Sequence, residues 1–231
     1  MPRADWNVIQ SYPDSMEPTP VDLAALRAEY ELGGLDEADL AADPFAMFGR
    51  WFADVTAAGL TEANAMVLAT AGADGRPSAR TVLLKGYDED GFVFFTNHAS
   101  RKGDELAANP ACALVFGWYP LQRQVRIEGS ARPVPRAETD AYFATRPRGS
   151  QLGAWASHQS SVVGSRAELE ASYRAAEERF GDGPIAAPPT WGGYRVAVET
   201  VEFWQGRRGR MHDRLVYRRV TGGWRTERLA P

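Results

Sequence analysis

The sequence has few of the residues that build disulfide frameworks and metal sites. Its 231 residues include one cysteine, Cys112, and three histidines that lie far apart, His98, His158 and His212. A single cysteine excludes an intrachain disulfide, and the histidines lack the short spacing of zinc ligands. The apolar run around the cysteine, ACALVF, indicates a buried strand. We therefore predict no metal site and a small core residue at Cys112.

Long apolar runs and an excess of positive charge are also missing. No segment approaches the roughly 18 consecutive apolar residues of a membrane helix, and the first 14 residues lack a basic-then-apolar signal pattern. The chain has 26 Lys and Arg against 30 Asp and Glu, a net charge of −4. Nucleic-acid-binding domains are more often basic. The composition predicts a cytoplasmic protein that binds neither nucleic acid nor membrane.

Three common catalytic and nucleotide-binding motifs do not occur. The sequence contains no GxGxxG and no GxxxxGK[ST], so it lacks the signatures of dinucleotide-binding folds and P-loops. The segment GAWASH near Ser157 does not match the GxSxG turn of hydrolases. The chemistry must therefore be sought in other segments.

The hydrophobic patterns predict a mainly β protein with peripheral helices. Residues 1–20 resemble a mobile, proline-containing tail, and residues 21–231 are expected to form one domain. Asp43 and Pro44 suit the start of a helix, and Ser100 is expected to cap another. Because strands and helices do not alternate, an antiparallel barrel is favoured over a parallel sheet. The expected helices are 21–32, 43–59, 100–109, 135–145 and 165–180, and the expected strands are 65–71, 78–87, 92–96, 111–119, 123–134, 194–204, 214–220 and 223–230.

Two basic segments occur in the first half of the chain. In RTVLLK, Arg80 and Lys85 are five residues apart in a predicted strand, so their side chains should project to opposite faces. In TNHASRK (96–102), Arg101 and Lys102 open a predicted helix. Cations there oppose the helix dipole unless an anion is bound, which indicates a phosphate site that includes Thr96. The alternatives are surface cations and a solvated helix start.

A third segment, YFATRPRGSQLGAW (142–155), indicates a second phosphate site. Tyr142 and Arg146 share one helix face, and Ser150 follows after Pro147 and Gly149 break the helix. The next loop, SHQSS, offers the neutral hydrogen-bonding groups of Gln159 and Ser160. Two phosphate sites suggest two phosphorylated ligands, such as a cofactor and a substrate.

The fourth segment is VEFWQGRRGRMHDR (201–214). Trp204 with an arginine ten residues later, Arg214, can frame a planar heteroaromatic ring by stacking and hydrogen bonding. The alternative is a charged hairpin turn. We expect Arg207 and Arg208 to be solvated turn residues.

Together these segments resemble the pyridoxine/pyridoxamine 5′-phosphate oxidase family from about residue 26 to residue 231. The resemblance implies a homodimer of split β-barrels with FMN at the subunit interface, and Gln159 and Ser160 reaching in from the partner. The implied FMN-binding residues are Arg80, Thr81, Val82, Leu83, Leu84, Lys85, Phe95, Thr96, Arg101, Lys102, Gln124, Gln159, Ser160, Trp204 and Arg214. The implied substrate-binding residues are Arg27, Tyr30, Lys85, Tyr142, Arg146, Ser150, Arg210, Met211 and His212, of which Arg210 and His212 are implied to be catalytic.

The reaction implied by the resemblance is oxidation of pyridoxamine or pyridoxine 5′-phosphate to pyridoxal 5′-phosphate. In that implied reaction a hydride would pass to N5 of FMN, and oxygen would be reduced to hydrogen peroxide. The sequence departs from some relatives at Asp36 and Glu37, which stand where a basic run is found, and at Phe95, where tyrosine is common. Two alternatives are another flavin or deazaflavin enzyme, for example one acting on a phenazine precursor, and a non-catalytic binder of FMN or pyridoxal phosphate.

Overall fold

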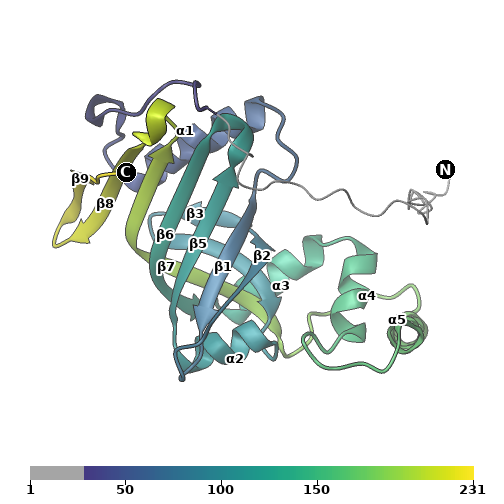
Figure 1. Ribbon diagram of the computed structural model, residues 1–231. Helices are drawn as coiled ribbons and strands as arrows, with labels where there is room; N and C mark the ends of the chain where they lie inside the picture. Colours follow the sequence, from purple (N-terminus) through teal and green to yellow (C-terminus); the bar gives the residue numbers. More distant parts are fainter. Residues whose placement is uncertain (1–28) are drawn as a thin grey trace.

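The computed structural model describes residues 29–231, which form a curled antiparallel sheet with helices at its ends and side (Figure 1). This confirms the predicted mainly β architecture with peripheral helices. The strands are β1 (Ala65–Ala71), β2 (Pro77–Leu83), β3 (Gly86–Asp88), β4 (Gly91–Asn97), β5 (Ala111–Trp118), β6 (Arg123–Pro133), β7 (Trp191–Gln205), β8 (Asp213–Val220) and β9 (Gly223–Arg228). The α-helices are α1 (Pro44–Ala57), α2 (Arg101–Ala108), α3 (Arg136–Thr145), α4 (Arg148–Ala156) and α5 (Arg166–Phe180).

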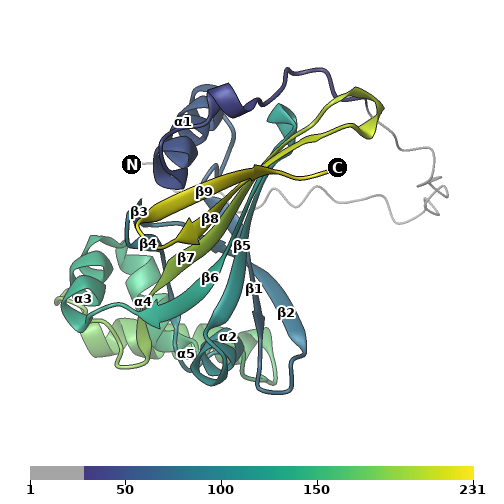
Figure 2. The ribbon, with the colours of Figure 1, turned by 90° about the vertical axis from the view of Figure 1, so that its left-hand side faces the viewer.

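The long strand β7 organises the sheet, whose order is β2-β1-β5-β6-β7-β4-β3. One edge of β7 pairs with β6. The other edge changes partner: residues 191–196 pair with β4, and residues 200–205 pair with β8. Beside this change the register between β6 and β7 shifts between Glu128 and Gly129, because β7 carries an extra residue there, Glu199. A side chain at Gly129 would collide with the carbonyl of Ala197. The sheet therefore splits along β7, and the two halves diverge in Figure 2.

Helix α1 closes the main hydrophobic core. Asp43 accepts hydrogen bonds from the backbone N–H groups of Phe45 and Ala46, as expected of the predicted N-cap. The helix buries Phe48 completely, and this ring lies 4.9 Å from that of Phe92 on β4. The helical spacing of the apolar residues thus fixes α1 against the sheet.

A second, smaller core lies beneath the helices next to the start of β7. Its buried members are Phe143, Leu152, Ala176, Ile185, Ala187 and Trp191. Helix α4 belongs to this core and was not expected, because Pro147 and Gly149 were interpreted as helix breakers. Pro147 does separate α3 from α4, but it occupies the N-cap of α4, where a missing N–H has no cost.

Two other predictions about the chain path were wrong. Residues 29–32, the described end of the predicted helix 21–32, are not helical, because the N–H groups of Glu31 and Leu32 both donate to Oε1 of Gln122. The rest of that helix and the predicted tail lie outside the described residues. The predicted strand 78–87 is two strands, because Leu84 N–H pairs with Asn64 beside β1, whereas Lys85 N–H pairs with Val93 on β4.

Candidate functional site

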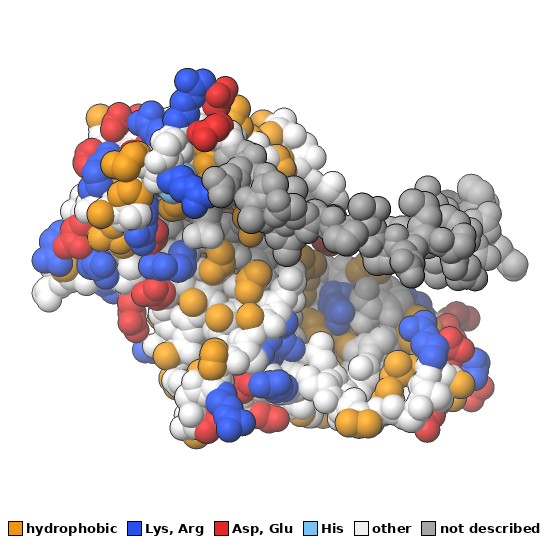
Figure 3. All heavy atoms as spheres, in the orientation of Figure 1, with side chains coloured by type: hydrophobic (Ala, Val, Ile, Leu, Met, Phe, Trp, Pro, Cys, Tyr) orange, Lys and Arg blue, Asp and Glu red, His pale blue; other side chains and the backbone are white. Residues whose placement is uncertain are grey.

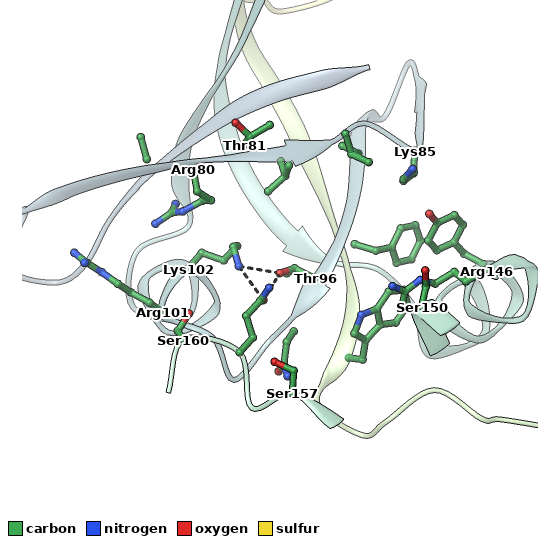
Figure 4. A pocket seen from close by; sticks show the side chains of 18 of the residues that line it. Arg80, Thr81, Lys85, Thr96, Arg101, Lys102, Arg146, Ser150, Ser157 and Ser160 are labelled. Atoms are coloured by element: carbon green, nitrogen blue, oxygen red, sulfur yellow. Dashed lines mark hydrogen bonds between the residues drawn. The ribbon is translucent and has the colours of Figure 1, made fainter. Parts of the chain in front are cut away.

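A cavity of about 850 Å³ lies between β2, β4, α2, α3 and the loop that follows α4 (Figure 4). In the space-filling view, Lys and Arg side chains are visible in the recess between the sheet and the helices (Figure 3). Leu84 was expected here, but its side chain is buried in the main core. The predicted residues that line the cavity are Arg80, Thr81, Val82, Leu83, Lys85, Phe95, Thr96, Arg101, Lys102, Tyr142, Arg146, Ser150, Gln159 and Ser160.

Lys102 is a buried cation with neutral partners. Its Nζ lies 3.1 Å from Thr96 Oγ1, 3.2 Å from Ser100 Oγ and 3.0 Å from Gln159 Oε1. Burial, together with the charge of Arg80, lowers the pKa of Lys102. Because no carboxylate among the described residues forms a salt bridge with this ammonium group, an anionic ligand is its natural counter-charge.

Gln159 lies in the cavity of its own chain. Its Oε1 accepts hydrogen bonds from Lys102 and from Thr96, the latter at 3.2 Å. The expectation that Gln159 and Ser160 reach in from a partner is therefore wrong for this chain, because the loop after α4 folds back over α2 and β4. Ser160 has a positive φ of 75°, the conformation of a tight loop residue.

Helix α2 begins beside Lys102 without a side-chain cap. Ser100 occupies the N-cap position, as predicted, but its Oγ donates 2.6 Å to the carbonyl of Asn97 instead of capping the helix. The first N–H groups of a helix attract anions when no side chain satisfies them. The uncapped start of α2 and Lys102 thus favour the same kind of ligand.

Arg80 and Arg101 are held by a buried carboxylate, Glu105, which the sequence analysis did not identify. Arg80 Nη2 lies 3.1 Å and Arg101 Nε 2.8 Å from the Glu105 carboxylate. Burial acts to raise the pKa of Glu105, but hydrogen bonds from Ser78, Thr70 and the two arginines outweigh it and lower the pKa to about 2. Glu105 is thus ionised at neutral pH.

The other end of the cavity contains a buried donor with no partner. The Arg146 guanidinium carbon lies 4.6 Å above the Trp191 ring, and its buried Nη1 makes no hydrogen bond to any described residue. Burial lowers the pKa of Arg146. An unsatisfied buried donor costs about 1–3 kcal/mol, so this arrangement favours an acceptor supplied by a ligand. Tyr142 stacks on Phe95 beside it, with ring centroids 4.1 Å apart.

The cations occupy two separate ends of the cavity. Figure 4 shows Lys85 and Arg146, with Ser150, on one side, and Arg80, Arg101 and Lys102 on the other. The expectation that Arg80 and Lys85 project to opposite faces of a strand is wrong, because β2 ends at Leu83 and the N–H group of Lys85 pairs instead with Val93 on β4. The geometry accommodates two anionic groups, as the two predicted phosphate sites require.

The remaining predicted residues form a second group, which we call the C-terminal cluster: Tyr30, Gln124, Trp204, Arg210, Met211, His212 and Arg214. Adjacent strands place Gln124, Trp204 and Arg214 in register on β6, β7 and β8. The Trp204 ring lies 4.6 Å from that of His212 and 5.8 Å from that of Tyr30. Arg27 lies outside the described residues.

Most arginines near the C-terminal cluster are paired with carboxylates. Arg214 donates 2.8 Å and 3.1 Å to the two carboxylate oxygens of Glu202, which is 2% exposed. The expectation of two solvated turn residues is wrong for Arg207, whose Nε lies 2.5 Å from Asp213, a buried carboxylate. Arg208 is exposed but pairs with Glu31 at 2.6 Å.

Arg210 differs from these paired arginines. It is exposed, forms no salt bridge with any described residue, and has a positive φ of 61°, which is uncommon outside glycine. Beside it, His212 Nδ1 accepts a hydrogen bond of 3.1 Å from the Arg207 N–H. A neutral His212 therefore carries its proton on Nε2 and can donate it to a ligand.

The cavity and the C-terminal cluster lie at different ends of β7. Trp191, at its first residue, lines the cavity, whereas Trp204 is near its last. They are 13 positions apart, which corresponds to roughly 40 Å of strand. One chain therefore does not bring the two groups together. Among residues 29–231, no three His, Cys, Asp or Glu side chains are grouped as metal ligands, and no helix is long and apolar enough to cross a membrane.

The cavity also includes residues that the sequence analysis did not assign to a site: Ser78, Ala79, Asn97, Thr145, Pro147, Ser157 and Trp191. Trp191 had a detectable signal, because it begins WGGYRV, a further segment that resembles the family. Asn97, Thr145, Pro147 and Ser157 lie within the basic segments and the SHQSS loop, but the sequence analysis assigned them no binding role there. Ser78 and Ala79 lie just before the RTVLLK segment.

The chain is similar to proteins of one known family. Residues 52–180 match the family model described as pyridoxamine 5′-phosphate oxidase, and residues 191–231 match that of the pyridoxine 5′-phosphate oxidase C-terminal dimerisation region. A pyridoxine/pyridoxamine 5′-phosphate oxidase of Nocardioides sp. is 66% identical over 211 residues, covering 91% of this chain and 99% of the relative. That of Rubrobacter xylanophilus is 60% identical, covering 91% and 97%.

Solved structures show the same fold. PhzG from Burkholderia lata 383, in complex with tetrahydrophenazine-1-carboxylic acid, is 32% identical with a TM-score of 0.79, covering 84% of this chain and 95% of that one. An FMN-binding protein from Nostoc punctiforme shares the fold, with a TM-score of 0.66 at 18% identity and coverage of 83% and 100%. The matched family model covers more than half of the sequence, and the curated relatives match it nearly from end to end. This chain belongs to the pyridoxamine 5′-phosphate oxidase family.

Proposed function

We propose that the protein oxidises pyridoxamine 5′-phosphate or pyridoxine 5′-phosphate to pyridoxal 5′-phosphate, with FMN as cofactor and oxygen as electron acceptor. The observation that carries this proposal is the unpartnered, buried Nη1 of Arg146, at the opposite end of the cavity from Lys102. Two cationic ends in one cavity suit a phosphorylated cofactor and a phosphorylated substrate. The names of the relatives at 60–66% identity support the same reaction.

The residues around Lys102 suit the phosphate of FMN. Arg80, Arg101 and Lys102 supply positive charge, Thr96 supplies a hydroxyl, and the uncapped start of α2 supplies N–H groups. Bound there, FMN would supply the hydride acceptor that the protein's own side chains lack. The chain's contribution is to hold the phosphate and to exclude water from the ring.

The other end suits the substrate phosphate. Lys85, Tyr142, Arg146 and Ser150 line it together. Their role is to bind the phosphate and so place the carbon to be oxidised at a fixed position relative to the flavin. The cation–π contact of Arg146 with the Trp191 ring holds its guanidinium group in place for binding the phosphate.

We further propose that the C-terminal cluster completes the cavity of a partner in a homodimer. The match of residues 191–231 to a dimerisation region supports this. The outward face of β1 and β5 presents small apolar side chains, including the 40% exposed Val67, as expected of a surface that a second copy covers. Trp204 and Arg214 would then contact the flavin, and Arg210 and the Nε2 proton of His212 would face the substrate.

The PhzG structure favours a second candidate, oxidation of a phenazine precursor. The ligand named for that protein is a carboxylic acid without phosphate. Such a ligand does not require Lys85, Tyr142, Arg146 and Ser150 to line the same cavity, as they do here. A non-catalytic binder, in turn, would not require the exposed, unpaired Arg210.

Oxygen consumption with phosphorylated and dephosphorylated substrates tests the proposal. The FMN-reconstituted protein should be yellow and should oxidise pyridoxamine or pyridoxine phosphate much faster than the dephosphorylated forms. Arg146→Ala should raise KM for the phosphorylated substrates about tenfold or more, since a charged hydrogen bond contributes about 1.5–3 kcal/mol. Arg76→Ala, at an 87% exposed side chain, is the matched control. Failure to bind FMN, or equal rates without phosphate, would overturn the proposal.

A further inference from the structure

Glu105 is an ionised carboxylate at a site proposed to bind a phosphate. Its side chain is 10% exposed and contacts Arg80 and Arg101, two of the cations lining the cavity. A negative charge close to an anion site weakens anion binding through Coulomb repulsion. We therefore expect the Glu105 carboxylate to have a role that offsets this repulsion. Its hydrogen bonds indicate what that role is.

The Glu105 carboxylate joins side chains from three elements. Its Oε2 accepts from Thr70 Oγ1 on β1 at 2.5 Å, from Ser78 Oγ on β2 at 2.6 Å and from Arg80 Nη2 at 3.1 Å. Its Oε1 accepts from Arg101 Nε, one turn earlier on α2, at 2.8 Å. The two arginines are thus hydrogen-bonded to the two oxygens of one carboxylate. This fixes the distance between their guanidinium groups before any ligand binds.

Arginine side chains lose considerable rotamer freedom when a ligand orders them. Arg80 is also fixed by a hydrogen bond from Nη1 to the carbonyl of Leu68, at 3.2 Å. Arg101 is 66% exposed and has no described hydrogen-bond partner other than Glu105. Ordering of Arg101 therefore depends on Glu105, and a preordered cation binds phosphate with a smaller entropy loss.

We propose that Glu105 is a positioning residue for the phosphate of FMN, which it serves by holding Arg80 and Arg101 in place. The inference rests on the proposed FMN site and goes beyond it, because Glu105 is not among the residues that line the cavity. Positioning and simple electrostatics predict opposite outcomes when the charge is removed. If the Glu105 carboxylate acts only through its charge, it weakens FMN binding, and removing that charge would strengthen FMN binding.

The test compares FMN with riboflavin, which lacks the phosphate, in titrations of the full-length apoprotein followed by flavin fluorescence. Glu105→Gln should weaken FMN binding about tenfold or more and leave riboflavin binding unchanged, because only the phosphate meets the two arginines. Asp104→Asn is the matched control, since it removes the same charge from the adjacent, exposed position of α2. It should leave the ratio of the two dissociation constants unchanged.

Unchanged or tighter FMN binding by Glu105→Gln would overturn the inference, as would an equal loss of FMN and riboflavin, which indicates general damage to the fold. If Glu105→Gln does not fold, as judged by circular dichroism, Glu105→Asp takes its place. The aspartate keeps the charge but is too short to place its carboxylate at the position of that of Glu105. It should therefore weaken FMN binding and leave riboflavin binding unchanged. An unaltered ratio of FMN to riboflavin affinity would overturn the inference. Failure of the unsubstituted protein to bind FMN would instead refute the proposed function.

Discussion

The cavity and the C-terminal cluster are built from the same residue types but differ in how their cations are compensated. In the cavity, Lys102 has only neutral partners and Arg146 keeps a buried donor unpaired. Near the C-terminal cluster, Arg207 and Arg214 are each paired with a buried carboxylate. The first region is arranged to receive anions, whereas the second is arranged to hold its side chains in position.

The exceptions in each region are informative. Glu105 is the carboxylate inside the cationic region, and it joins two arginines without lining the cavity. Arg210 is the exposed cation without a described salt bridge in the C-terminal cluster, and its backbone is held at a positive φ. These observations indicate that the ion pairs formed in the folded chain decide which cations are left to bind a ligand. The number of arginines in a sequence motif does not identify them.

The largest effect is expected when Lys102 loses its charge. Lys102→Met keeps the length of the side chain but removes the buried ammonium group, whose hydrogen bonds to an ionised ligand contribute about 1.5–3 kcal/mol each. FMN affinity should fall about a hundredfold. Equilibrium dialysis with FMN measures this, with Arg76→Ala as the control. An unchanged affinity would show that the cavity is not the site of the cofactor phosphate.

Mixed dimers test whether the two regions meet across chains. Lys102→Met and Arg210→Ala should each lower turnover as homodimers, Arg210→Ala while retaining FMN. After subunit exchange, half of the dimers contain both variants, and each of these has one intact site, so activity should recover to about a quarter of that of the unsubstituted protein. Absence of recovery, with exchange verified by mass spectrometry, would place both regions in the same subunit's site.

Glu105 should make stability depend on acid pH. Its pKa is lowered from 4.5 to about 2, so the stabilisation it provides is complete above about pH 4.5 and decreases as the pH falls toward 2. Urea unfolding at pH 6 and pH 3 should therefore show a difference between the unsubstituted protein and Glu105→Gln that becomes smaller at pH 3. A difference that stays constant with pH would show that the carboxylate charge does not stabilise the fold.

The smallest effect is expected at Arg208. Its partner Glu31 lies 2.6 Å away, but the two side chains are 74% and 58% exposed, and such pairs contribute at most about 1 kcal/mol. Arg208→Ala should change the free energy of unfolding by about 0.5 kcal/mol or less, and Arg207→Ala by more, because it removes a donor from the buried Asp213. Equal losses in urea denaturation would contradict the distinction between the two arginines.

The sequence determined those features that depend on neighbouring residues. Asp43 and Pro44 start α1 as predicted, and the alternation of Val125 and Ile127 with polar residues on β6 matches the buried and exposed faces. The segments around Arg80, Lys102 and Arg146 were recognised from their local patterns, because a cation at a helix end or beside a turn has a direct physical consequence.

Only the tertiary structure decided which of these groups meet. Because β2 ends early, Arg80 and Lys85 line the same cavity. Gln159 lies in the cavity of its own chain, where it accepts a hydrogen bond from Lys102. Arg207 is paired with Asp213. The fold also brings Glu105 into contact with Arg80, from which it is 25 residues distant in sequence. Trp204 lies away from the cavity, near the other end of β7. Contacts between distant residues depend on strand order and register, which no local pattern specifies.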